Sequence, residues 1–164
     1  MKKNVETFIG CDCEYEDAQI VIFGAPFDST TSFRPGTRFA SHAIRSESFG
    51  IETYSPYQDK DLTEISVFDA GDLELCFGNS EKALCQIQEM VSEIFEDNKT
   101  PCMIGGEHLV TLGAVREAAR RHDNLHIVHF DAHTDLREDY LGETLSHATV
   151  IRRCHDLLGD GKIY

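Results

Sequence analysis

The stretch TPCMIGGEHLVTLGAVREAARRHDNLHIVHFD, residues 100–131, decides the fold class. It predicts a short apolar strand over 100–106, a helix over 108–121 and a second apolar strand over 125–131. Both strands are near-continuous hydrophobic runs, which are typical of strands buried on both faces of a sheet. Strands that alternate with helices form β-α-β units, so we expect these two strands to be parallel.

The same alternation extends toward the start of the chain. Two more apolar runs predict strands over 18–26 and 64–72. Segment 80–97 repeats apolar residues at three- and four-residue spacing, which predicts an amphipathic helix with Ser80 as its N-cap. In the helix over 108–121, Leu109, Leu112 and Val115 are expected to face inward. The predicted fold class is therefore α/β, with three α/β/α layers around a mostly parallel sheet, in one domain over 1–164.

Composition weighs against several classes of protein. The 164 residues carry a formal net charge of -14, which disfavours nucleic acid as a partner and is compatible with a small cationic substrate. Acidity alone is better explained by solubility. No apolar run approaches the length of a membrane span, so we expect no membrane partner. The six scattered cysteines favour a reducing, cytoplasmic location, and CDC at 11–13 lacks the spacing of a metal site.

Side chains that can bind metal follow two of the predicted strands. His108 comes after the glycine pair 105–106, and the last strand runs into DAHTD, residues 131–135. If these strands are neighbours, His108, Asp131, His133 and Asp135 converge at the carboxyl edge of the sheet, where such sheets bind ligands. Two imidazoles and two carboxylates suit divalent Mn, Fe, Co or Zn. The alternative is that these polar residues merely end their strands.

Other kinds of site have little support. The sequence lacks the glycine-rich motifs of dinucleotide and phosphate binding and the G-x-S-x-G motif of serine hydrolases. His126 and His129 lie within the last predicted strand, and we interpret both as structural.

Several motifs, in order, resemble one known family. GGEH at 105–108 followed by HFDAHTD at 129–135 resembles the ureohydrolases, the arginases and agmatinases. GAPFDSTTSFRPGTRFASHAIRSES at 24–48 and FDAGD at 68–72 are similar to further segments of that family. One departure is FAS at 39–41, where the family commonly has Phe-Gly-Pro. The resemblance implies hydrolysis of a guanidino group with two manganese ions, by a metal-bridging hydroxide.

The resemblance also implies roles for single residues. His108 and Asp135 would hold one manganese, His133 would hold the other, and Asp131 would bridge both. Asp135 would additionally orient the hydroxide. His147 matches the histidine that the family uses for proton transfer; the alternative is a surface histidine after a loop.

The segment before His147 bears on the substrate. Its Tyr-Leu-Gly run leading to SHAT is similar to agmatinases, which favours hydrolysis of agmatine to urea and putrescine. Arginine, guanidinobutyrate and formiminoglutamate are the alternative substrates. The resemblance further implies a trimer or hexamer.

One expected motif is missing. The family supplies two more metal carboxylates, and an acid that grips the guanidinium, from an Asp-x-Asp motif on a later strand, and the sequence does not contain it. We therefore expect the chain to correspond to the amino-terminal portion of such a hydrolase. The alternative is a non-catalytic metal-binding module of the same fold.

Overall fold

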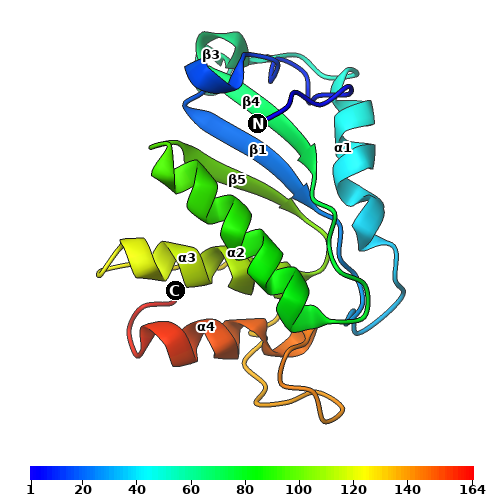
Figure 1. Ribbon diagram of the computed structural model, residues 1–164, viewed down its shortest axis with the longest axis vertical. Coiled ribbons are helices and arrows are strands. Elements are labelled where there is room, and N and C mark those ends of the chain that lie inside the picture. The colour runs from blue at the N-terminus through cyan, green and yellow to red at the C-terminus, as the bar shows by residue number, and fades with distance from the viewer.

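Three parallel strands form the main sheet, in the spatial order β4-β1-β5. The computed structural model describes residues 1–164, and Figure 1 shows the three strands side by side. Their bounds are β1 Ile20–Ala25, β4 Val67–Asp72 and β5 Thr100–Gly105. In register, Ile20 of β1 lies opposite Val67 on one side and Thr100 on the other. A small antiparallel pair, β2 Tyr54–Ser55 and β3 Lys60–Asp61, lies apart from this sheet.

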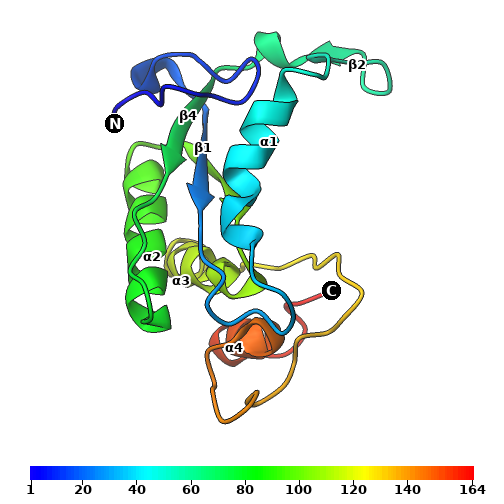
Figure 2. The ribbon, with the colours of Figure 1, turned by 90° about the vertical axis from the view of Figure 1, so that its right-hand side faces the viewer.

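Helices cover both faces of the sheet, as the sequence predicted. Figure 2 shows α1 on one side of the strands and α2 on the other. The helix bounds are α1 Ala40–Ser48, α2 Ser80–Glu96, α3 Thr111–Arg121 and α4 Val150–Leu158. The central strand supplies the middle of the core, because Val21 and Phe23 are fully buried. No helix combines the length and the apolar character that crossing a bilayer requires.

Helix α2 buries the predicted apolar stripe, including Leu84, Ile87 and Val91. The predicted cap is wrong by one residue: the Asn79 side chain accepts the N–H of Lys82 and caps the helix. Asparagine and serine are both good caps, so adjacent candidates are not separable by residue type.

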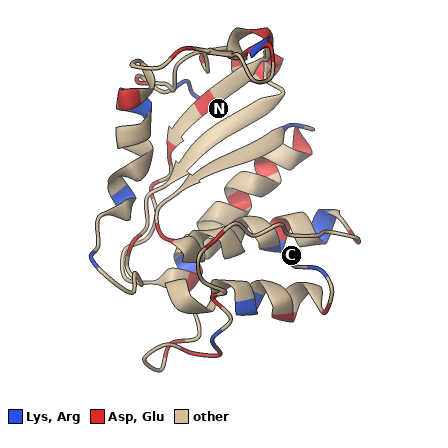
Figure 3. Cartoon of the chain, turned by 180° about the vertical axis from the view of Figure 1, so that it is seen from behind, with Lys and Arg blue, Asp and Glu red and all other residues tan.

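Helix α3 packs closely on α2, and Leu109, Leu112 and Val115 face inward as predicted. A Cβ at Gly113 would lie 2.9 Å from the Cβ of Ile87, so the close approach requires glycine at this position. Acidic and basic residues lie on all four main helices (Figure 3), and Arg116 of α3 pairs with Glu81 of α2.

The predicted strand over 125–131 is wrong. Only Ile127 forms an isolated bridge, with Ile163, and the hydrogen bonds of this segment go to residues 162–164. The segment is not a neighbour of β5 in the sheet. Val128 and Phe130 are 65% and 94% exposed, so the apolar run is not buried on both faces. An apolar run indicates strand propensity, but a strand forms only where a partner backbone lies alongside it.

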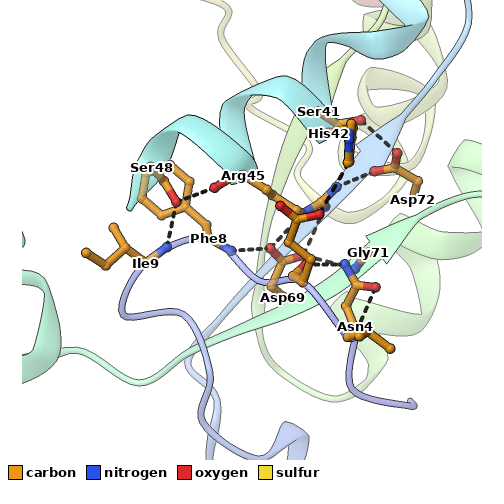
Figure 4. Close-up of polar contacts among 12 residues, drawn as sticks. Asn4, Phe8, Ile9, Ser41, His42, Arg45, Ser48, Asp69, Gly71 and Asp72 are labelled. Atoms are coloured by element: carbon orange, nitrogen blue, oxygen red, sulfur yellow. Dashed lines mark hydrogen bonds and ion pairs between the residues drawn. The ribbon is translucent and has the colours of Figure 1, made fainter. Parts of the chain in front are cut away.

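A buried ion-pair network fixes α1 to the end of β4 (Figure 4). The Arg45 guanidinium donates from Nε and Nη2 to the two oxygens of Asp69, at 2.8 and 2.9 Å, and from Nη1 to Asp72. Asp69 also accepts the backbone N–H of Phe8 at 2.9 Å. The amino-terminal segment is therefore fastened to the same carboxylate that anchors the helix.

Candidate metal centre

The turn after β5 brings His108 to the carboxyl end of the sheet. A Cβ at Gly106 would lie 2.0 Å from the carbonyl oxygen of Phe27, so only glycine allows the two backbones to approach this closely. Backbone hydrogen bonds from Gly106 to Ala25 and from Glu107 to Phe27 hold the turn against the end of β1. The next residue, His108, begins the short helical turn that leads into α3.

His108 and Asp135 meet although their segments are not neighbouring strands. His108 Nδ1 lies 2.7 Å from Asp135 Oδ2. Asp135 has a φ of 45°, a left-handed conformation that is uncommon for a residue other than glycine. Its carbonyl oxygen accepts the N–H of Arg152 at 3.2 Å, so α4 stabilises the turn that aims the carboxylate. Unusual backbone conformations of this kind are found at functional sites more often than elsewhere.

Asp131 presents its two oxygens to different histidines. Oδ2 lies 3.6 Å from His108 Nδ1 and 3.5 Å from His129 Nε2, whereas Oδ1 lies 3.6 Å from His133 Nδ1. The backbone N–H of His133 donates to Oδ1 at 2.9 Å and lowers the pKa of Asp131 below its usual value. The carboxylate is therefore ionised at neutral pH, with one oxygen directed to each side.

The structure thus brings together three of the four predicted ligands, His108, Asp131 and Asp135. The fourth, His133, has a side chain that is 83% exposed, and of the Asp131 oxygens it approaches Oδ1.

His147 lies beside this group. The backbone N–H of His108 donates to His147 Nδ1 at 3.2 Å, so in this arrangement the neutral ring carries its proton on Nε2. The backbone N–H of His147 donates to Thr30 Oγ1 at 3.0 Å. A histidine merely exposed after a loop would have neither contact.

Glu107 and Thr30 are two polar residues of the site to which sequence reasoning gave no role. The buried Glu107 carboxylate accepts the backbone N–H of Thr30 at 2.6 Å and its hydroxyl at 2.7 Å. Burial raises the pKa of Glu107, and these hydrogen bonds oppose that rise. Glu107 belongs to the GGEH motif, which could have indicated a role in the site. No sequence pattern indicated a role for Thr30, because its contact with Glu107 spans 77 residues.

A cavity of about 330 Å³ opens at this group, and His133, Asp135 and His147 line it. Asp135 is the only carboxylate in its wall, and Tyr140 and Arg137 line another part. A larger hollow of about 630 Å³ lies near Pro26, Phe39 and Phe77 and contains none of the predicted site residues. The chemistry of the side chains, more than the size of the hollow, identifies the smaller cavity as the candidate site.

The donor set fits a divalent first-row metal ion. Imidazole nitrogens and carboxylate oxygens are the ligands that Mn, Fe, Co and Zn share. His129 Nε2 is buried and has no hydrogen-bond partner, although it faces Asp131. An unpaired buried ring nitrogen beside two other potential ligands is an arrangement that a metal ion would satisfy.

Comparison with known proteins places this site in a family. The model of the arginase family matches residues 18–164. The agmatinase of Bacillus subtilis is 46% identical over 159 residues, which are 97% of this chain and 55% of that relative. The chain therefore spans about half the length of the curated relatives that it matches.

Solved structures agree with the sequence comparison. The agmatine ureohydrolase of Thermoplasma volcanium superposes with a TM-score of 0.89 at 36% identity, over 98% of this chain and 55% of that one. The proclavaminate amidinohydrolase of Streptomyces clavuligerus gives a TM-score of 0.87 at 33% identity, with the same coverage. With a family model that matches nearly the whole sequence and this shared fold, the chain belongs to the arginase family.

Proposed function

We propose that this protein is a manganese-dependent hydrolase of a guanidino compound, and that agmatine is its substrate. The observation that carries the proposal is the group of His108, Asp131 and Asp135 with His147 beside it, of which Asp135 and His147 line one cavity. The identity to the Bacillus subtilis agmatinase supports agmatine over arginine, guanidinobutyrate or formiminoglutamate. The six free cysteines support a cytoplasmic location.

The ligands divide between two ions. His108 and Asp135 would hold one ion, His133 would hold the other, and Asp131 would bridge them. The contacts of Asp131 support this division, because Oδ2 lies 3.6 Å from His108 Nδ1 and Oδ1 lies 3.6 Å from His133 Nδ1. When bound, such a pair of ions lowers the pKa of a shared water, which supplies a nucleophile at neutral pH.

The chain's own residues would then orient the reactants and move one proton. Asp135 accepts a hydrogen bond from the attacking water and fixes its direction. The water oxygen adds to the guanidinium carbon, and the bond from that carbon to the substituted nitrogen breaks. The proton that the water loses passes to Asp135. His147 in its protonated form delivers a proton from Nε2 to the departing nitrogen, which leaves as putrescine while urea forms, and the neutral ring then recovers the proton from Asp135. Glu107 and Thr30 hold the loops on which His147 and His108 stand.

A second candidate is a metal-binding module without catalysis. The observation that favours it is the cavity wall, in which Asp135 is the only carboxylate that could receive a guanidinium. Such a module would bind metal but release no urea.

The test is urea release from agmatine with and without added Mn²⁺, measured on the 164-residue chain and on any longer product of its reading frame. His147→Asn is expected to lower kcat by about 10²–10⁴-fold, the range of general acid catalysis. His155→Asn, a change at a histidine of α4 that pairs with Asp160, is the matched control and should leave kcat unchanged. No urea from any guanidino substrate by either form would refute the enzyme and leave the module.

A further inference from the structure

We propose that a second copy of this chain docks at the larger hollow, beside Phe77, and that the hairpin of residues 140–143 is the segment that enters it. Two copies would exchange these hairpins around a two-fold axis. The hollow lies outside the metal centre, and the inference does not depend on the proposed reaction.

The hairpin is closed by its own backbone. The N–H of Tyr140 donates to the carbonyl oxygen of Glu143 at 2.9 Å, and the N–H of Glu143 donates back at 3.1 Å. Leu141 and Gly142 between them have φ values of 55° and 85°, as the tight type I′ turn requires. Asp139 Oδ1 also accepts the N–H of Gly142 at 3.2 Å. A segment that already has its bound shape loses little conformational freedom when it docks.

An apolar side chain stands at the tip of this hairpin. Leu141 is 88% exposed, and the loop between α3 and α4 that carries it projects beyond α4 in both perpendicular views (Figures 1 and 2). A single exposed leucine is ordinary on a protein surface. This one, however, lies between Asp139 and Glu143, so the hairpin presents one apolar anchor flanked by carboxylates.

The hollow offers an apolar surface that can receive such an anchor. Its volume is about 630 Å³, and Phe39, Leu73, Leu75 and Phe77 form much of its lining. Leu75 belongs to the core, whereas Phe39 and Phe77 are 67% and 84% exposed. Exposed apolar side chains that gather around a hollow are typical of an interaction site, unlike those that are scattered singly.

The unpaired charges of the two surfaces are opposite. Lys82 lines the hollow and forms no ion pair within the chain, whereas Arg38, the other cation there, is paired with Asp28. On the loop of the hairpin, Glu138 pairs with an arginine of α4, whereas the Glu143 carboxylate forms no ion pair. The hollow therefore has one free cation and the hairpin one free acid. Attraction between opposite charges of this kind favours the matching orientation of two copies over others.

Both surfaces meet at the start of α2. The hollow includes Phe77 and Lys82, and a second, polar hollow is lined by residues 78–81 together with residues 143–145 at the end of the hairpin. A two-fold axis brings the same face of both copies together, so each hairpin can enter the hollow of the other copy. Because Tyr140 of the hairpin lines the candidate catalytic cavity, such docking would also fix one wall of that cavity.

Analytical ultracentrifugation of the metal-free 164-residue chain, under reducing conditions, measures the dissociation constant of the dimer. Leu141→Asn removes the apolar anchor but keeps the hairpin, because Asn-Gly is a preferred pair in a type I′ turn. This variant should raise the dissociation constant about tenfold or more, the effect of losing an apolar side chain that fills a pocket at an interface.

Exchanging the two free charges tests the contact itself. Lys82→Glu and Glu143→Lys should each weaken association, because each variant places like charges together. A mixture of the two variants should associate as tightly as the wild type, since both contacts of the mixed dimer then pair opposite charges. Glu74 also lines the hollow, so Glu74→Gln should tighten association by removing a like charge from the surface that receives Glu143. The matched control is Lys60→Glu, which changes the net charge equally at an exposed position of β3 and should leave the dissociation constant unchanged.

Three results would overturn the proposal: a monomer at every accessible concentration, a dimer that Leu141→Asn leaves unchanged, or association that the mixture of charge variants does not restore. Circular dichroism establishes that each variant is folded. Because the measurement uses neither metal nor substrate, its outcome is independent of the urea assay. A chain that dimerises through this hairpin and releases no urea would retain the docking surface and refute the hydrolase.

Discussion

Replacing Arg45 by methionine is expected to be among the most destabilising single changes in this chain. The Arg45 side chain is 3% exposed, and the Asp69 side chain that it pairs with is 0% exposed. Arg45→Met keeps most of the buried volume but removes all three donors to Asp69 and Asp72. What remains on Asp69 is a buried carboxylate with backbone donors only, from Phe8 and Gly71.

The magnitude follows from that uncompensated charge. Removing one partner of a buried ion pair costs about 3–5 kcal/mol, so the free energy of unfolding should fall by that amount. For a chain of this size the melting temperature should fall by about 6–20 °C. By contrast, the Arg152–Asp156 pair of α4 is exposed to solvent, and Arg152→Met should lower the free energy of unfolding far less than Arg45→Met.

Urea unfolding followed by circular dichroism measures both variants under identical conditions. A second comparison adds Asp69→Asn, which removes the charge that Arg45 neutralises. The double variant should be less destabilised than the sum of the two single variants, by about 1–3 kcal/mol. A loss below about 1 kcal/mol for Arg45→Met, or strict additivity, would show that the network does not hold α1 to the sheet in the way described.

Three further changes test other parts of the structure by the same unfolding assay. Thr30→Val removes the hydroxyl that Glu107 accepts and should lower the free energy of unfolding by about 1–3 kcal/mol; wild-type stability would contradict that contact. Ile87→Ala, at a fully buried position, should cost about 2–5 kcal/mol, and a loss well under that range would mean that the site collapses around the smaller residue. Hydrogen bonds from Arg38 lower the pKa of Asp28, so this pair stabilises the fold at pH values above about 4 and the contribution is lost as the pH falls through the lowered pKa. Arg38→Met should therefore destabilise the protein more at about pH 7 than at a pH below the lowered pKa of Asp28, and an equal loss at both would refute the linkage.

The elements that the sequence predicted are those whose signal is local. Each strand of the main sheet is a short apolar run, and the α2 stripe repeats every three or four residues, so composition and spacing were sufficient for them. The α4 helix was not predicted, although Val150, Ile151 and Cys154 are buried at helical spacing. Those positions follow a loop with charged and glycine residues, which masked the pattern.

Contacts between residues that are far apart in the sequence could not be predicted from local patterns. The segment over 125–131 has the composition of a buried strand, but its backbone pairs with residues 162–164 and not with β5. Thr30 reaches Glu107 from the other end of the chain, and no local pattern indicates such a pair. The predicted convergence of His108 with Asp135 occurs by a different route, through a left-handed turn at Asp135 that α4 supports.

The distribution of cations among the acidic side chains supports a metal centre. Three of the four buried acids, Asp28, Asp69 and Glu117, each pair with an arginine, and the fourth, Glu107, is held by Thr30. Asp131 and Asp135 have no arginine or lysine partner, and only imidazoles approach them. Two carboxylates that both lie near His108 repel each other, and in a chain with a net charge of -14 the surrounding field adds to that repulsion. A divalent cation between them would supply the charge that the arginines supply elsewhere, and so would stabilise the fold as well as provide the site.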